Sequence, residues 1–242
     1  MVRRALVFVL AAVSLLAAGC TGADAQRAQE LLAEAQAAEA NLDSMSFVIR
    51  VWAEMDGQSF SIRLAGGGYL KGERAGDMVL AGTGEGLGST MPPFRVLSLG
   101  GRMYMESNGV RQEIPASAAD QALQSQLEQF DITRYVTDVR VTPGPDFAGE
   151  SETRIEGVID TSSLVGGLFE ELGTLTQLGG SSLPDVAEGF GDTRVALYVS
   201  DTTHLVRAAM ITMPMDIQGE KLEIHVDLVV RSVNQPIPEL DS

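Results

Sequence analysis

The chain of 242 residues is poor in the side chains on which most catalytic and metal sites depend. It contains one cysteine and two histidines. A single thiol cannot form an intramolecular disulfide, which excludes a disulfide-stapled scaffold. Each histidine is predicted to stand alone on a strand, and neither has partners at metal-ligand spacing. His225 lies between Glu223 and Asp227 on a predicted exposed face, so we interpret it as part of a solvated charge cluster and predict no metal site.

Short catalytic motifs are lacking as well. No Gly-x-Ser-x-Gly elbow is present, and the glycine-dense stretch "TGEGLGST" at 83–90 has neither dinucleotide-fingerprint nor P-loop spacing, so we predict a flexible loop there. Glu170 and Glu171 are adjacent on a predicted helix and point in different directions. We therefore predict no catalytic residue and no cofactor. An enzyme stays open as a third alternative, because carboxylate sites can be scattered along a sequence.

Positive charge is also scarce. The chain has 17 Lys and Arg against 33 Asp and Glu, a net charge of -16, and loss of residues 1–19 with Arg3 and Arg4 would take this to -18. A surface this acidic repels phosphate backbones. We predict no nucleic-acid partner, and no approach to the membrane through a basic patch.

The one long apolar run lies at the N-terminus. Arg3 and Arg4 precede about a dozen apolar residues, Ala5 to Leu16, and the small residues of 17–19 follow. The run is shorter than the roughly 18 to 20 apolar residues that a membrane-spanning helix needs. Residues 1–19 are therefore predicted to be a secretory signal peptide.

The lone cysteine, Cys20, stands directly after this run. The sequence "LAAGC" at 16–20 resembles the bacterial lipobox. That resemblance implies that Cys20 becomes the first residue of the mature chain and carries a diacylglyceryl group and an amide-linked acyl chain such as palmitate, and that the protein is extracytoplasmic and anchored to the bacterial cell membrane. Two or three acyl chains make such an anchor stable. The alternative is a secreted protein whose cysteine happens to fall at the cleavage point.

The mature chain is predicted to be one domain, residues 27–242, behind a lipidated tether of residues 20–26. Residues 21–26, if extended, span roughly 20 Å. The alanine-rich residues 27–42 have apolar side chains near helical spacing and no glycine or proline, which predicts a helix.

After this helix the apolar period changes from 3.6 to 2. In "SMSFVIRVWAEM" alternate residues are apolar, "DGQ" at 56–58 predicts a hairpin turn, and similar patterns predict about nine strands, ending with "KLEIHVDLVV". Two further helices are predicted at 116–130 and 162–175, the second loosened by Gly166 and Gly167. Short strands with few long crossovers favour an α+β fold, a curved antiparallel sheet packed on helices.

Methionine is common in the predicted strands and loops. Because its side chain is flexible and polarizable, it suits an irregular apolar lining, although any one methionine is more simply core filler. These residues are Met45, Met55, Met78, Met91, Met103, Met105, Met210, Met213 and Met215.

In the order of its segments, residues 27–238 resemble the LppX/LprAFG family of bacterial lipoproteins. The likeness rests on "LDSMSFVIRVWAEMDG", the "GGRMYMESNG" hairpin, "IEGVIDTSSL" and "VALYVSDTTHLVRAAM". It implies a LolA-like fold, a half-barrel closed by helices on its concave side around a lipid-sized cavity. It also implies a non-catalytic carrier of a long-chain lipid or glycolipid, in some cases working beside a membrane exporter.

Alternation selects the side chains that would line such a cavity. Two alternatives stay open: the same residues could pack on helices with no void, and the protein could be a tethered interaction module with a closed core that docks on an envelope complex. The expected lipid-binding residues of the sheet are Phe47, Ile49, Val51, Phe60, Ile62, Leu64, Leu222, Ile224, Val226 and Leu228. Those of a helical lid are Leu164, Leu168 and Phe169.

Overall fold

The computed structural model describes residues 22–55, 58–86, 89–114, 136–146, 149–161, 191–217 and 219–241. These residues form one antiparallel sheet of 11 strands and two helices, α2 (Ala23–Glu39) and the short α6 (Pro238–Asp241). The first six strands are β1 (Ser44–Met55), β2 (Gln58–Tyr69), β3 (Met78–Gly86), β4 (Ser89–Leu99), β5 (Arg102–Ser107) and β6 (Val110–Ile114). The other five are β7 (Val136–Pro143), β8 (Glu152–Ile159), β9 (Thr193–Ser200), β10 (Val206–Ile217) and β11 (Glu220–Val233).

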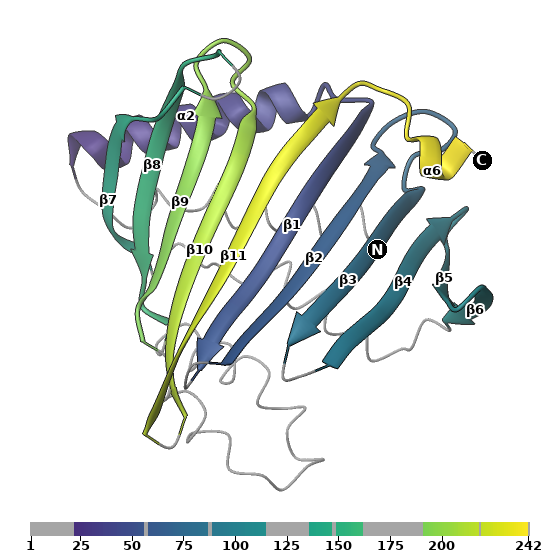
Figure 1. Cartoon of the computed structure of the whole chain (residues 1–242). Helices are drawn as coiled ribbons and strands as arrows, with labels where there is room; N and C mark the ends of the chain where they lie inside the picture. The colour runs from purple at the N-terminus through teal and green to yellow at the C-terminus, as the bar shows by residue number, and fades with distance from the viewer. Residues whose placement is uncertain are drawn as a thin grey trace, which may run out of the picture.

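The first and last strands of the chain lie side by side in the middle of the sheet. The strand order is β6-β5-β4-β3-β2-β1-β11-β10-β9-β8-β7, so each half of the sheet runs outward from the β1–β11 pair through neighbours in the sequence (Figure 1). The β1–β11 pairing therefore joins the two halves into one surface.

Bulges interrupt four of the strand pairs. They lie between Ser46 and Phe47, between Gly82 and Gly84, between Thr137 and Arg140, and between Val206 and Ala208. An extra residue in one strand bends it and increases the local twist. The bulges thus supply curvature to a sheet that would otherwise be flatter.

Helix α2 crosses the sheet on one face, which we call the inner face; the opposite one is the outer face (Figure 1). The helix begins at Ala23, four residues earlier than predicted. Residues 23–26 are therefore helical, and the extended tether expected for residues 20–26 is shortened. The polar residues Asp24 and Gln26 look like a spacer in the sequence, but both lie on exposed positions of the first helical turns.

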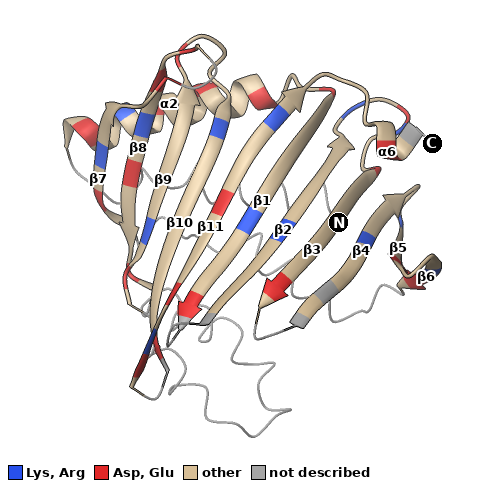
Figure 2. Ribbon diagram, viewed as in Figure 1, with Lys and Arg blue, Asp and Glu red and all other residues tan. Residues whose placement is uncertain are grey.

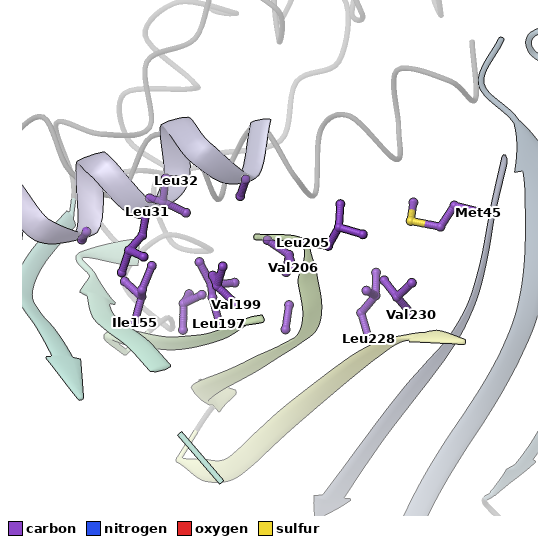
Figure 3. Close-up of a cluster of buried hydrophobic side chains, with 14 of the residues drawn as sticks. Leu31, Leu32, Met45, Ile155, Leu197, Val199, Leu205, Val206, Leu228 and Val230 are labelled. Atoms are coloured by element: carbon purple, nitrogen blue, oxygen red, sulfur yellow. The ribbon is translucent and has the colours of Figure 1, made fainter. Parts of the chain in front are cut away.

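The main core lies between α2 and the strands of the second half of the sheet. Leu31 and Leu32 of α2 point toward Ile155, Leu197 and neighbouring side chains of the strands (Figure 3). These four residues are each at most 3% exposed. The apolar stripe of α2 thus anchors it to the sheet.

The C-terminal segment covers part of the outer face. Ile237, 2% exposed, packs on Val79 and Leu97, and its N–H donates to the hydroxyl of Tyr69 at 3.2 Å. The side chain of Arg74 donates to the carbonyl of Leu240 at 2.7 Å. This segment therefore covers the outer face at one end of β2 to β5.

Two predictions need correction, and a third lies outside the described residues. The sheet has 11 strands rather than about nine, because β7 was missed and β3 was only partly recognised. The stretch at 83–90 is not a loop throughout: residues 83–86 end β3, and β4 begins at Ser89. The predicted helices at 116–130 and 162–175 lie outside the described residues, so closure of the inner face by further helices stays a prediction.

Candidate functional site

The ten expected sheet residues lie on the inner face and form a continuous apolar surface. Strand register places Ile49 between Leu64 and Leu228, and Val51 between Ile62 and Val226. Ala53 lies in the same way between Phe60 and Ile224, so three rows cross β2, β1 and β11. Phe47 and Leu222 extend this surface along β1 and β11 in opposite directions. Leu164, Leu168 and Phe169, the expected lid residues, lie outside the described residues.

The apolar surface continues onto strands that contributed nothing to the predicted site. Leu228 pairs with Ala209, which pairs with Leu197, which pairs with Ile155. These residues escaped sequence reasoning because β9 and β10 are apolar on both sides, so alternation does not show which side faces inward.

Phe94 is a further inner-face residue that the sequence did not single out. It lies opposite Gly82, and a Cβ added at that glycine would come within 2.5 Å of the Phe94 ring and 2.7 Å of Leu64. Glycine at this position lets both side chains pack over the strand. The sequence signal was the glycine itself, since glycine inside a strand marks a close approach of neighbours.

Six of the seven methionines with described side chains occupy inner-face register positions, which agrees with an apolar lining. Met78, for example, pairs with Gly68, and Met213 pairs with Ile224. Met210 is the exception, and its prediction as lining is wrong. It pairs with Asp227 on the outer face, is 42% exposed, and its sulfur accepts a hydrogen bond from the Tyr198 hydroxyl at 3.7 Å.

Charge is almost confined to the outer face. Among the paired strand residues of the described chain, only Glu220, at the tip of the β10–β11 hairpin, combines a charge with an inner-face position. Figure 2 shows charged positions on most of the strands, and strand register assigns them to the opposite side of the sheet. Away from Glu220, the inner face therefore has no charged side chain that an apolar ligand would have to desolvate.

Burial of the inner face falls with distance from α2. Phe47 and Leu228, at the end of the sheet near the helix, are 3% and 8% exposed. Val51, Ile62 and Val226 are only partly buried. The helix thus covers one end of the apolar surface, and the side chains beyond it keep part of their surface accessible.

The described hollows open on the outer face. They have volumes of about 770, 520 and 510 Å³ and are lined mainly by outer-face residues of β2 to β5, of β7 to β10, and of β1, β2, β3 and β11. None of these described hollows is an enclosed cavity on the inner face, so the cavity expected there stays a prediction.

Among the described residues, no three His, Cys, Asp or Glu side chains gather closely enough to hold a metal ion. His204 was wrongly predicted on a strand. It lies in the β9–β10 turn with a φ of 56°, and its Nδ1 is 3.2 Å from a carboxylate oxygen of Glu34 on α2. His225 stacks on Trp52, with ring centroids 4.6 Å apart, and its Nε2 is 2.8 Å from Glu223. The contacts with Trp52 and Glu223 thus hold His225 in a defined position within the predicted charge cluster.

Four described carboxyl groups have a shifted pKa, among them Glu39 and Asp227. Burial at the C-terminal end of α2 raises the pKa of Glu39 to about 7, although the Val206 N–H, which donates to it, acts in the opposite direction. Burial also raises the pKa of Asp227 on the outer face, partly offset by Arg50 and His225. Neither carboxyl belongs to the inner apolar surface of the strands.

No helix among the described residues is long and apolar enough to span a bilayer.

No protein-family model matches the chain, and no curated protein matches its sequence. Its structure is similar to that of lipoprotein LppX from Mycobacterium tuberculosis, with 18% identity and a TM-score of 0.47 over 86% of this chain and 95% of LppX. It is also similar to LprF from Mycobacterium bovis, with 14% identity and a TM-score of 0.45 over 88% of this chain and 95% of LprF. Lipovitellin matches with 7% identity and a TM-score of 0.33 over 80% of this chain and 26% of its own. The resemblance to LppX and LprF noted in the sequence is thus confirmed as a structural similarity.

Proposed function

We propose that this protein is a non-catalytic lipid carrier. It binds the acyl chain of a long-chain lipid or glycolipid against the inner face of its sheet and moves it between the membrane and envelope partners. The observation that supports this proposal is the composition of the inner face. Apolar side chains of β1, β2 and β11 form unbroken rows there, and only Glu220 among the paired positions is charged. The side chains that α2 does not cover are partly accessible.

The energetics favour an acyl chain as the occupant. Burying one methylene group contributes about 0.8 kcal/mol, so a chain of ~16 carbons represents roughly 12 kcal/mol of gross transfer free energy. A ligand held in this way leaves into water very slowly. Loading and unloading therefore need contact with a membrane or with a partner such as a membrane exporter.

An acylated Cys20 would supply the membrane contact. With α2 beginning at Ala23, the sheet would be held near the bilayer by a shorter segment than an extended tether of residues 20–26. Such an anchor would hold the protein outside the cytoplasm at the cell membrane, where acyl chains rather than surface charge bring it to lipid. The anchor is tested by mass spectrometry of the full chain against Cys20→Ala, which should lack the mass of the acyl groups and appear in the soluble fraction.

Binding is tested on residues 21–242 produced without the anchor. The purified protein is extracted with organic solvent, and the extract is analysed by mass spectrometry. A long-chain lipid in a near-stoichiometric amount is the expected result. Repeated absence of lipid from folded protein would refute the carrier function.

A second candidate is a tethered interaction module, and the edge of the sheet favours it. All residues of edge strand β6 are exposed, including Val110 at 67%, and Met105 on the neighbouring β5 is 43% exposed. An exposed edge can pair with a strand of another protein. Absence of lipid together with capture of an envelope complex through β6 would establish this function instead.

A further inference from the structure

Two arginines face each other across β1 and β2 on the outer face. Arg50 pairs directly with Arg63 in the strand register, which brings their Cβ atoms to about 4.5–5.5 Å from each other. Like charges in this position are destabilising. The pair stands out in a chain that has 33 acidic residues available and only 17 basic ones.

A third arginine joins them around a groove. The hollow of about 510 Å³ between β1, β2, β3 and β11 is lined by Arg50, Arg63 and Arg231, with Val48 and Val229 also in its lining. All three arginines are exposed residues. Within the described part of the chain, no carboxylate oxygen lies within 4.0 Å of a guanidinium nitrogen of these three arginines, so none of them forms an ion pair. Arg95 and Arg111 on the same face both form ion pairs with Glu106.

Carboxylates at the edge of the groove limit what can occupy it. Asp227 lies opposite Arg50 on β11, and Glu85 lies on β3; both line the groove. A broad anionic surface such as a bilayer would bring its charges against these carboxylates. A small anionic group can contact the guanidinium groups alone, and the carboxylates can accept hydrogen bonds from hydroxyl groups beside it.

We infer that this groove, the arginine groove, binds a phosphoryl group. Guanidinium groups present planar forks of N–H donors that match phosphate oxygens, and the resulting charge-assisted hydrogen bonds are stronger than neutral ones. A bound phosphate would also relieve the repulsion between Arg50 and Arg63. The inference is independent of the proposed lipid carriage, because the groove lies on the face opposite to the apolar surface.

The molecule contains its own reporter for this site. Trp52 is the only tryptophan in the chain, and the guanidinium carbon of Arg50 lies 5.0 Å from the centroid of its ring. His225 also stacks on this ring, with ring centroids 4.6 Å apart. An anion that draws the Arg50 guanidinium toward the groove therefore changes the environment, and the fluorescence, of Trp52.

The test is a fluorescence titration of the full mature chain in non-ionic detergent with inorganic phosphate, at ionic strength held constant with sodium chloride. The wild type should give a saturable change, and Arg63→Gln should weaken binding at least tenfold. Arg102→Gln, an exposed outer-face arginine on β5, should titrate like the wild type. The urea midpoint of phosphate-free Arg63→Gln should not fall, because the substitution removes a repulsion, and this separates lost binding from lost folding.

A second titration, with a short-chain phosphatidic acid, distinguishes the sources of the phosphoryl group. A response to both probes that depends on Arg63 identifies the phosphoryl group itself as the ligand. A response to the lipid alone that depends on Arg63 identifies a phospholipid headgroup. The inference is overturned if neither probe changes the emission of the wild type, or if Arg63→Gln and Arg102→Gln respond identically.

Discussion

Ionisation of Glu39 is expected to weaken the folded state as the pH rises. Its carboxyl is held at the C-terminal end of α2, where burial raises its pKa from 4.5 to about 7. The negative end of the helix dipole acts in the same direction. The folded protein therefore holds a proton on Glu39 between pH 4.5 and 7 that the unfolded chain has released, so the free energy of unfolding decreases as the pH rises through this window.

The size of this effect follows from the shift. A difference of about 2.5 pH units corresponds to an upper limit of about 3 kcal/mol, at 1.36 kcal/mol per unit. The partial exposure of the residue makes the expected value smaller, about 1–2 kcal/mol. Because α2 covers one end of the inner face, the same proton also influences how firmly that end is closed.

Urea unfolding at pH 5 and pH 8 measures this effect. Glu39→Gln keeps an oxygen that can accept the hydrogen bond from the Val206 N–H but cannot ionise. The variant should match the wild type at pH 5 and exceed its free energy of unfolding by about 1–2 kcal/mol at pH 8. Glu30→Gln, an exposed carboxyl on the same helix, is the control and should follow the wild type within about 0.5 kcal/mol. Parallel pH profiles for Glu39→Gln and the wild type would refute the reasoning.

Four further substitutions test the two faces of the sheet. Val226→Asp puts a charge on the inner face and should reduce the extracted lipid at least tenfold, whereas Val229→Asp on the outer face of the same strand should keep it; equal retention in folded variants would contradict the proposed lining. Gly82→Ala should lower the free energy of unfolding by about 1–3 kcal/mol in urea, because its Cβ overlaps the Phe94 ring; an unchanged midpoint would show that the ring can move aside. Ile237→Ala should cost about 2–4 kcal/mol in the same assay, and a loss below about 1 kcal/mol would mean that the C-terminal segment does not contribute to the core.

Alternation along single strands determined most of the predicted site. In β1, β2 and β11 the apolar residues recur every second position, and side chains of a strand alternate between its two faces. This rule of covalent geometry holds whatever the partners of the strand are. The inner-face positions of Val51, Ile62 and Val226 could therefore be read from the sequence.

Where both sides of a strand are apolar, or where glycine leaves a position without a side chain, alternation does not show which residues face inward. The outer face of β9 and β10 carries few polar residues, so the sequence did not show that Met210 lies on it. Gly84 and Gly86 of β3 looked like parts of a loop because glycine is a poor strand former. Phe60 packs where a side chain at Gly86 would be, and Leu64 and Phe94 pack in the same way at Gly82 of this strand.

Only the tertiary structure decided which strands are neighbours. β1 and β11 lie at opposite ends of the described sheet in the sequence, and no local turn fixes their register. Their pairing sets Val51 beside Val226 and brings Arg231 to the groove that already contains Arg50 and Arg63. A hairpin register is set by its own turn, whereas a pairing between distant strands depends on the whole core, and for this reason the apolar rows and the arginine groove become visible only in the folded protein.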